Sequence, residues 1–303
     1  MFGLIYLPEN ASFLFITLMN PRASLITGIL CISFAPIFVR LAAAPPVTSA
    51  FYRMFIAFLA LLPYCIVKGK LKAGRNELIY AIAGGVIFGA DIALWNISLT
   101  KTSATVSTLI ANLSPVWVGI LSFLLYRKSS GKQFWIGTVL AIAGIVILAG
   151  YKNIMALNLN DGILLALLSS LLYAVYILLT KSIIKDIGTL TFVFYNLLGA
   201  TLFSFAVCAF QQNVFVSFST QTWLCFAGSG LICQLAGWLT ITHALRFLPS
   251  TKVSLALLSR AVIACFWAFL FLNERLSIYE ITGSIIVLAG IAVTFLKPGK
   301  PAA

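Results

Sequence analysis

The sequence predicts an all-α polytopic membrane protein with ten transmembrane helices in two inverted five-helix repeats. Three observations lead to this fold class: an apolar composition, a succession of apolar runs of membrane-spanning length, and a similarity between the two halves of the chain. Of the 303 residues, 61% are hydrophobic and 9% are charged, and the mean hydropathy is +1.07. A water-soluble domain of this length carries many more polar side chains. The composition therefore excludes a soluble protein.

Apolar runs recur along the whole chain, each close to the roughly 20 residues that a helix needs to cross about 30 Å of hydrocarbon. Residues 1–21 are interrupted by Pro8, Glu9 and Asn10, so we expect an interfacial or disordered N-terminal leader there, or a native start at Met19. Residues 298–303 are expected to form a cytoplasmic tail. The ten expected spans are 23–42, 47–67, 77–99, 103–126, 133–151, 161–181, 189–210, 222–244, 252–272 and 277–296.

The basic residues that give the net charge of +13 lie mostly in the short segments between the apolar runs. This is a signal of membrane topology and not of a nucleic-acid-binding face. If the N-terminus is cytoplasmic, Lys101, Lys152 and Arg275 are the basic loop residues that fall on the opposite side. Because Lys and Arg are enriched in cytoplasmic loops, we expect both termini in the cytoplasm.

The two halves of the chain carry similar patterns in the same order. LSPVWVGILSFLL at 113–125 precedes AIAGIVIL at 141–148, and LSRAVIACFWAFL at 258–270 precedes VLAGIAVT at 287–294. We therefore expect a first repeat over 22–151 and a second over 152–297. Five spans per repeat is an odd number, so the repeats must be inverted, as in many secondary transporters with a substrate site near the midplane.

Arg40, Arg53, Asp91 and Arg260 are ionisable residues within the expected spans, and such residues are costly in a membrane unless they serve a function. Arg40 lies near a span end, where its side chain can reach the interface. Arg53 and Asp91 lie at similar depth in neighbouring spans, so we expect either a static ion pair or a pair that substrate or a proton opens. Arg260 lies near the midplane, where it must face a cavity, carbonyl groups or an anionic ligand.

Aromatic and amide side chains at helical spacing complete the candidate substrate cavity, since they offer cation–π surfaces and hydrogen bonds. Each of them taken alone is more often a packing residue. Pro36 and Pro115 are expected to kink their helices, as alternating access requires bending. The further cavity candidates are Trp95, Asn112, Tyr173, Tyr176, Tyr195, Asn196, Gln234 and Trp238.

Several short segments carry a resemblance to a known family: SFAPIFVRL at 33–41, FYR at 51–53, ADIALW at 90–95, TSA at 102–104, ANLSP at 111–115, Gln234 with Gly237-Trp238, and Asn273-Glu274-Arg275 followed by Gly283. Together they resemble the EamA-type branch of the drug/metabolite transporter superfamily. The resemblance covers about 22–297 and implies ten helices in two inverted repeats, a central cavity and transport of small metabolites across a bacterial inner membrane. Two departures are Arg260, where the family has a second proline, and Tyr126-Arg127-Lys128 in place of a Gly-Glu pair.

These features predict a secondary transporter that moves a small amphiphilic metabolite by alternating access. Amino acids and related compounds are the leading substrate class, because Asp91 can bind an amino group and Arg260 or Arg53 can bind a carboxylate. Uptake of a nucleotide-like or sulfonium metabolite and efflux of drugs are the alternatives. Protonation of Asp91 would couple transport to a proton gradient, and facilitated exchange is equally allowed.

Other functional classes lack their sequence features. The chain has no H-E-x-x-H or G-x-S-x-G motif and a single histidine, so we expect no enzyme, no metal and no cofactor. A channel is disfavoured because no ring of charges or filter-like loop is visible. The expected partners are a small-molecule substrate, protons as a candidate coupling ion and the lipid bilayer, with no nucleic acid, for a monomer or a homodimer.

Overall fold

The computed structural model describes residues 20–69, 71–102, 104–127, 130–149, 160–211, 217–272 and 277–295. In these ranges all regular structure is helical, and ten helical stretches are long and apolar enough to cross a membrane. The predicted all-α fold with ten spans is confirmed. Of the predicted leader, the structure describes only the last two residues, Asn20 and Pro21. The predicted tail lies outside the described residues.

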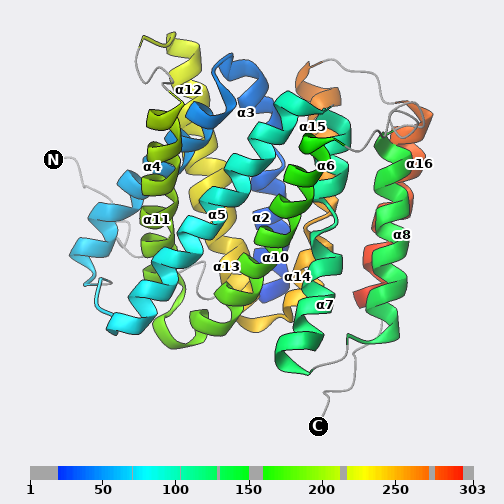
Figure 1. Ribbon diagram of the computed structural model, residues 1–303, viewed down its shortest axis with the longest axis horizontal. Coiled ribbons are helices and arrows are strands. Elements are labelled where there is room, and N and C mark those ends of the chain that lie inside the picture. Colours follow the sequence, from blue (N-terminus) through cyan, green and yellow to red (C-terminus); the bar gives the residue numbers. More distant parts are fainter. Residues whose placement is uncertain are drawn as a thin grey trace, which may run out of the picture.

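The first half of the chain forms five spans, two of them broken (Figure 1). Asn20 caps the first helix, since its side chain accepts a hydrogen bond from the backbone N–H of Arg22. The elements are α2 (Pro21–Ile32) with α3 (Ala35–Ala42), α4 (Pro46–Val67), α5 (Arg75–Lys101), α6 (Ala104–Ala111) with α7 (Ser114–Tyr126), and α8 (Lys132–Ala149).

The second half forms the other five spans. Its third span passes through a π-helix, η1 (Ser229–Gly237), a wider turn that is frequent at functional sites. The elements are α10 (Asp161–Ile187), α11 (Thr189–Phe210), α12 (Thr220–Gly228) continuing through η1 into α13 (Trp238–Phe247), α14 (Ser250–Ala256) with α15 (Ser259–Leu272), and α16 (Ile278–Phe295).

The helix breaks lie where the sequence places proline, and at one further point. Pro36 lies in the first turn of α3 and Pro115 in the first turn of α7, each directly after a break. The break between α14 and α15 has no proline, yet it lies at the corresponding place in the second half, just before Arg260. There the Ser259 hydroxyl donates to the Ala256 carbonyl at 2.7 Å. A serine hydroxyl thus satisfies a backbone group that the break frees.

The packing of the helices follows the pattern that two related halves would give. α5 packs against α10 and α11, and its counterpart η1–α13 packs against α2 while η1 also contacts α4. The last helices of the halves, α8 and α16, run along each other at one edge (Figure 1). A Cβ on Gly144 would lie 2.8 Å from the Gly283 carbonyl oxygen, so glycine is what permits this close approach.

The sixth span is longer than predicted, because α10 continues beyond 181 to Ile187. The predicted end at Lys181 rests on the assumption that Lys181 and Lys185 belong to a loop. Instead the Lys181 Nζ donates to the carbonyl oxygens of Leu245, Arg246 and Leu248, at 2.8, 3.1 and 2.8 Å. A lysine at this place satisfies the free carbonyls that end α13 and interacts favourably with its helix dipole.

The two ends of the bundle differ in charge. We call the end at which α4, α7, α10 and α13 finish the basic end, because most described lysine and arginine residues of the loops lie there. The opposite end holds the start of α4 and the end of α5 at Lys101. Lys101 forms an ion pair of 3.6 Å with Asp161, the first residue of α10.

Candidate functional site

Asp91 lies in the interior of the bundle on the face of α5 that packs against α10. Its side chain is 9% exposed, and its Oδ1 accepts a hydrogen bond of 2.5 Å from the Ser169 hydroxyl of α10. Among the described residues no lysine or arginine lies within ion-pair distance of Asp91. Asp91 is therefore held by one hydroxyl group, which leaves the rest of its acceptor capacity open.

Arg53 does not form the ion pair with Asp91 that was one of the two expectations. Its Nε donates to the Gln234 Oε1 at 2.9 Å, across the contact between α4 and η1. Gln234 is 1% exposed, so this hydrogen bond is shielded from the lipid and from water. The two side chains do not pair because Arg53 faces η1 while Asp91 faces α10. Similar depth along the two helices does not indicate the direction in which each side chain points.

Arg260 follows the break between α14 and α15 and meets the break between α6 and α7. Its Nη2 donates to the Asn112 Oδ1 at 3.4 Å, and its guanidinium carbon lies 5.8 Å from the centre of the Tyr173 ring. Tyr173 also lies one helical turn after Ser169, the α10 residue whose hydroxyl donates to Asp91. Tyr173 is therefore close both to Arg260 and to the contact that α10 makes with Asp91.

An aromatic cluster lies beside these charges. We define it as Phe88 of α5, Tyr173 and Tyr176 of α10, and Trp238 of α13, whose ring centres lie 4.8 to 6.2 Å apart. The Tyr173 hydroxyl and the Trp238 Nε1 are both buried, and neither has a hydrogen-bond partner among the described residues. Because buried donors are normally satisfied, these two groups are candidates for contact with a ligand.

Three predicted cavity residues make none of these contacts. The Tyr195 hydroxyl donates to the Leu71 carbonyl at 2.7 Å, at the basic end of the bundle. Asn196 is buried where α11 crosses α5, with its amide nitrogen 3.3 Å from the position of a Cβ on Gly84. Trp95 is half-buried, and its carbonyl accepts from the Ser98 hydroxyl. The other eight predicted residues make contacts in the interior: Arg53 with Gln234, Arg260 with Asn112 and Tyr173, Tyr173 with Tyr176 and Trp238, and Asp91 with Ser169 of α10.

Four residues of this region are absent from the predicted cavity. Ser169 holds Asp91, Phe88 belongs to the aromatic cluster, and the Trp117 Nε1 donates to the Ser170 hydroxyl at 2.9 Å. Ser169 and Ser170 could have been found in the sequence as two adjacent hydroxyls in the apolar run 163–178, because buried hydroxyl groups need hydrogen-bond partners. Phe88 could have been found from its spacing, because it lies one helical turn before Asp91 on the same face.

The arrangement is suited to binding and not to metal chemistry. Within the described ranges no three His, Cys, Asp or Glu side chains gather so as to hold a metal ion. One carboxylate, two guanidinium groups, amides and two unpaired donors surround an aromatic surface. Such a set can bind a small molecule that carries both an acidic and a basic group.

Comparison with known proteins identifies the family. The model of the EamA-like transporter family matches the chain twice, over residues 23–150 and 160–296. The chain belongs to the EamA-like transporter family. The predicted membership is confirmed, and the EamA protein described here is a multi-pass membrane transporter.

Its relatives are transporters of low sequence identity. The uncharacterized transporter YdfC of Bacillus subtilis (strain 168) is 22% identical, over 91% of this chain and 90% of its own. The S-adenosylmethionine uptake transporter of Rickettsia prowazekii (strain Madrid E) is 23% identical, over 79% of each chain. One crystal structure matches with a TM-score of 0.77 at 18% identity, over 91% of this chain and 97% of the other, which shows that the two share a fold.

Proposed function

We propose that this EamA protein is a secondary transporter for a small amphiphilic metabolite, with amino acids as the leading class. In this proposal Asp91 binds the amino group, and Arg260 binds the carboxylate with help from the unpaired donors of Tyr173 and Trp238. The observation that carries the proposal is the position of Tyr173, which lies 5.8 Å from the Arg260 guanidinium and one helical turn from the Ser169 that holds Asp91, with its own hydroxyl unpaired among the described residues. A zwitterion would satisfy all of these groups at once.

The membrane placement is part of the same proposal. We place the basic end in the cytoplasm, because the described loop lysines and arginines gather there and the opposite end holds Lys101. Both termini are then cytoplasmic, and the membrane is a bacterial inner membrane. The buried side chains of the aromatic cluster require the helices to move before a substrate can reach them. Protonation of Asp91 is the proposed coupling step, with facilitated exchange as the alternative.

A second candidate substrate is a sulfonium metabolite. One relative is an S-adenosylmethionine uptake transporter, and such a compound combines an amino acid group with a positive sulfonium and an aromatic base. The aromatic cluster offers ring faces that attract a sulfonium and can stack with a base. The two candidates share the amino acid group, so they use Asp91 and Arg260 in the same way.

Counterflow in proteoliposomes tests the proposal. Labelled amino acids are offered in one arm and labelled S-adenosylmethionine in another, with and without a pH gradient. We expect saturable flux of one class that Asp91→Asn abolishes. The matched control is Asp186→Asn, which removes an exposed carboxylate near the end of α10. Equal flux in both variants would contradict a role for Asp91, and flux of neither class would move the substrate outside both.

A further inference from the structure

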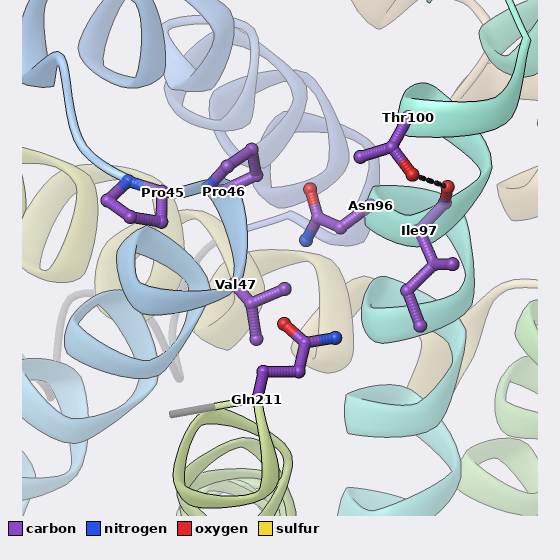
Figure 2. Close-up of a pocket in the computed structure, with 7 residues that line it drawn as sticks. All are labelled: Pro45, Pro46, Val47, Asn96, Ile97, Thr100 and Gln211. Atoms are coloured by element: carbon purple, nitrogen blue, oxygen red, sulfur yellow. Dashed lines mark hydrogen bonds between the residues drawn. The ribbon is translucent and has the colours of Figure 1, made fainter. Parts of the chain in front are cut away.

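A pocket lies at the opposite end of the bundle, away from the charged residues and the aromatic cluster. It has a volume of about 260 Å³ and is lined by the start of α4, the last turns of α5 and the end of α11 (Figure 2). None of its lining residues is charged. They are Pro45, Pro46, Val47, Asn96, Ile97, Thr100 and Gln211.

Asn96 is the polar group of this pocket that needs a partner. Its side chain is 6% exposed and points from α5 toward Pro46 and Val47, into the space between the helices (Figure 2). It has no hydrogen-bond partner among the described residues, whereas the Thr100 hydroxyl already donates to the Ile97 carbonyl at 2.8 Å. The amide faces the open pocket, so its oxygen can accept and its nitrogen can donate a hydrogen bond to a group bound there.

The depth of Asn96 indicates what that group is. α5 has 27 residues, and at about 1.5 Å per residue it spans roughly 40 Å, the thickness of a bilayer with its polar interfaces. Asn96 lies a little more than one turn from the end of α5, or about 7 Å below it. This is the boundary between head groups and hydrocarbon, where the glycerol esters of phospholipids lie.

The surroundings of the pocket suit an acyl chain. Pro45, Pro46, Val47 and Ile97 form its apolar walls. The end of α11 continues into an outward face whose large side chains are exposed to the lipid region. These are Leu202 at 58%, Phe205 at 50% and Phe210 at 88%. An occupant that enters from the membrane therefore meets apolar surface first and the amide last.

We propose that this pocket binds a phospholipid of the leaflet at the opposite end, with the Asn96 Nδ2 donating to a glycerol ester carbonyl. The site is separate from the proposed substrate site. Asn96 lies on the side of α5 that faces α4 and α11, whereas Asp91 faces α10. The lipid would fill the gap between α4 and α5 and stabilise the position of both helix ends.

The test compares an ester lipid with its ether analogue. The purified full-length protein in a maltoside detergent, which has no ester, is titrated with dihexanoyl phosphatidylcholine or with dihexyl phosphatidylcholine, and the rise in Tm gives the affinity. We expect the ester lipid to bind on the order of fivefold more tightly, because one neutral hydrogen bond distinguishes the two. In Asn96→Leu the two affinities should be equal.

Two further variants keep the test decisive if Asn96→Leu does not fold. Thr100→Trp fills the mouth of the pocket and should weaken the binding of both lipids. Leu202→Trp, which adds the same side chain on the exposed face of α11, should keep the wild-type preference. No ester preference in the wild type, or an unchanged preference in Asn96→Leu, would overturn the proposal. Displacement of the lipid by millimolar amino acids would instead assign the pocket to a water-soluble solute.

Discussion

The contact between α8 and α16 and the centre of the bundle are two ways to fill the interior of a membrane protein. At the edge, Gly137 and Gly144 lie against Gly290 and Gly283, so that the helix backbones touch. In the centre, α5, α10, α13 and α15 bring together charges, amides and unpaired donors beside aromatic rings. Backbone contact fills the edge, whereas charged and hydrogen-bonding side chains fill the centre. This difference assigns a structural role to the first region and a binding role to the second.

The largest expected effect is at the edge. A Cβ on Gly144 would lie 2.6 Å from the backbone nitrogen of Val287, and backbone cannot move aside as a side chain can. Gly144→Leu should therefore separate α8 from α16 and cost about 3 kcal/mol or more, a large fraction of the stability of a typical protein. The measurement is the yield of monodisperse protein by size-exclusion chromatography. Val139→Leu, on the exposed face of α8, is the control and should behave as wild type.

Arg260→Met should have the opposite profile, with transport lost and folding kept. Removing a charge from a membrane interior does not destabilise the fold unless the charge is needed there. The expected loss is roughly 100-fold in flux, the size expected when the arginine that pairs with the carboxylate of the proposed substrate is removed. Flux is compared with that of Arg22→Gln, an exposed position at the start of α2. A misfolded Arg260→Met protein would show that the arginine is structural.

Tyr173→Phe distinguishes a binding group from a packing group more finely. The hydroxyl has no partner among the described residues, so its removal should leave the Tm unchanged or slightly raised. If the hydroxyl binds substrate, KM should rise about fivefold, corresponding to about 1 kcal/mol. Tyr52→Phe, a buried tyrosine outside the aromatic cluster, is the comparison. An unchanged KM would leave Tyr173 as packing alone.

The smallest expected effect is at Ser170. Ser170→Ala removes the hydroxyl that accepts from the Trp117 Nε1, a contact between α7 and α10 that satisfies both groups. The loss of this neutral hydrogen bond should cost about 1 kcal/mol of stability and leave the flux of folded protein unchanged. A thermal melt together with counterflow measures both. A loss of transport without a loss of stability would extend the binding region to Ser170.

The sequence was sufficient for the spans and insufficient for the directions of the side chains. Apolar runs mark helices because each must cover the hydrocarbon, and most predicted ends agree with the structure to within a few residues. The end of α10 was missed because Lys181 was assigned to a loop, although its partners are carbonyls of another span. Depth along the helices predicted that Arg53 lies near Asp91. The rotation of α4 about its axis instead directs the Arg53 side chain toward Gln234. Rotation depends on packing against neighbours, which one sequence does not specify.

The three carbonyls held by Lys181 have a mechanical consequence. Because one ammonium group bonds to Leu245, Arg246 and Leu248 together, α10 cannot slide past the connection from α13 to α14 unless all three bonds break at once. The proposed substrate site needs motion, and these helices carry Tyr173 and Trp238. They should therefore turn as one lever, with its pivot at the basic end. Spin labels on α10 and α13 near that pivot should keep a constant separation through the transport cycle.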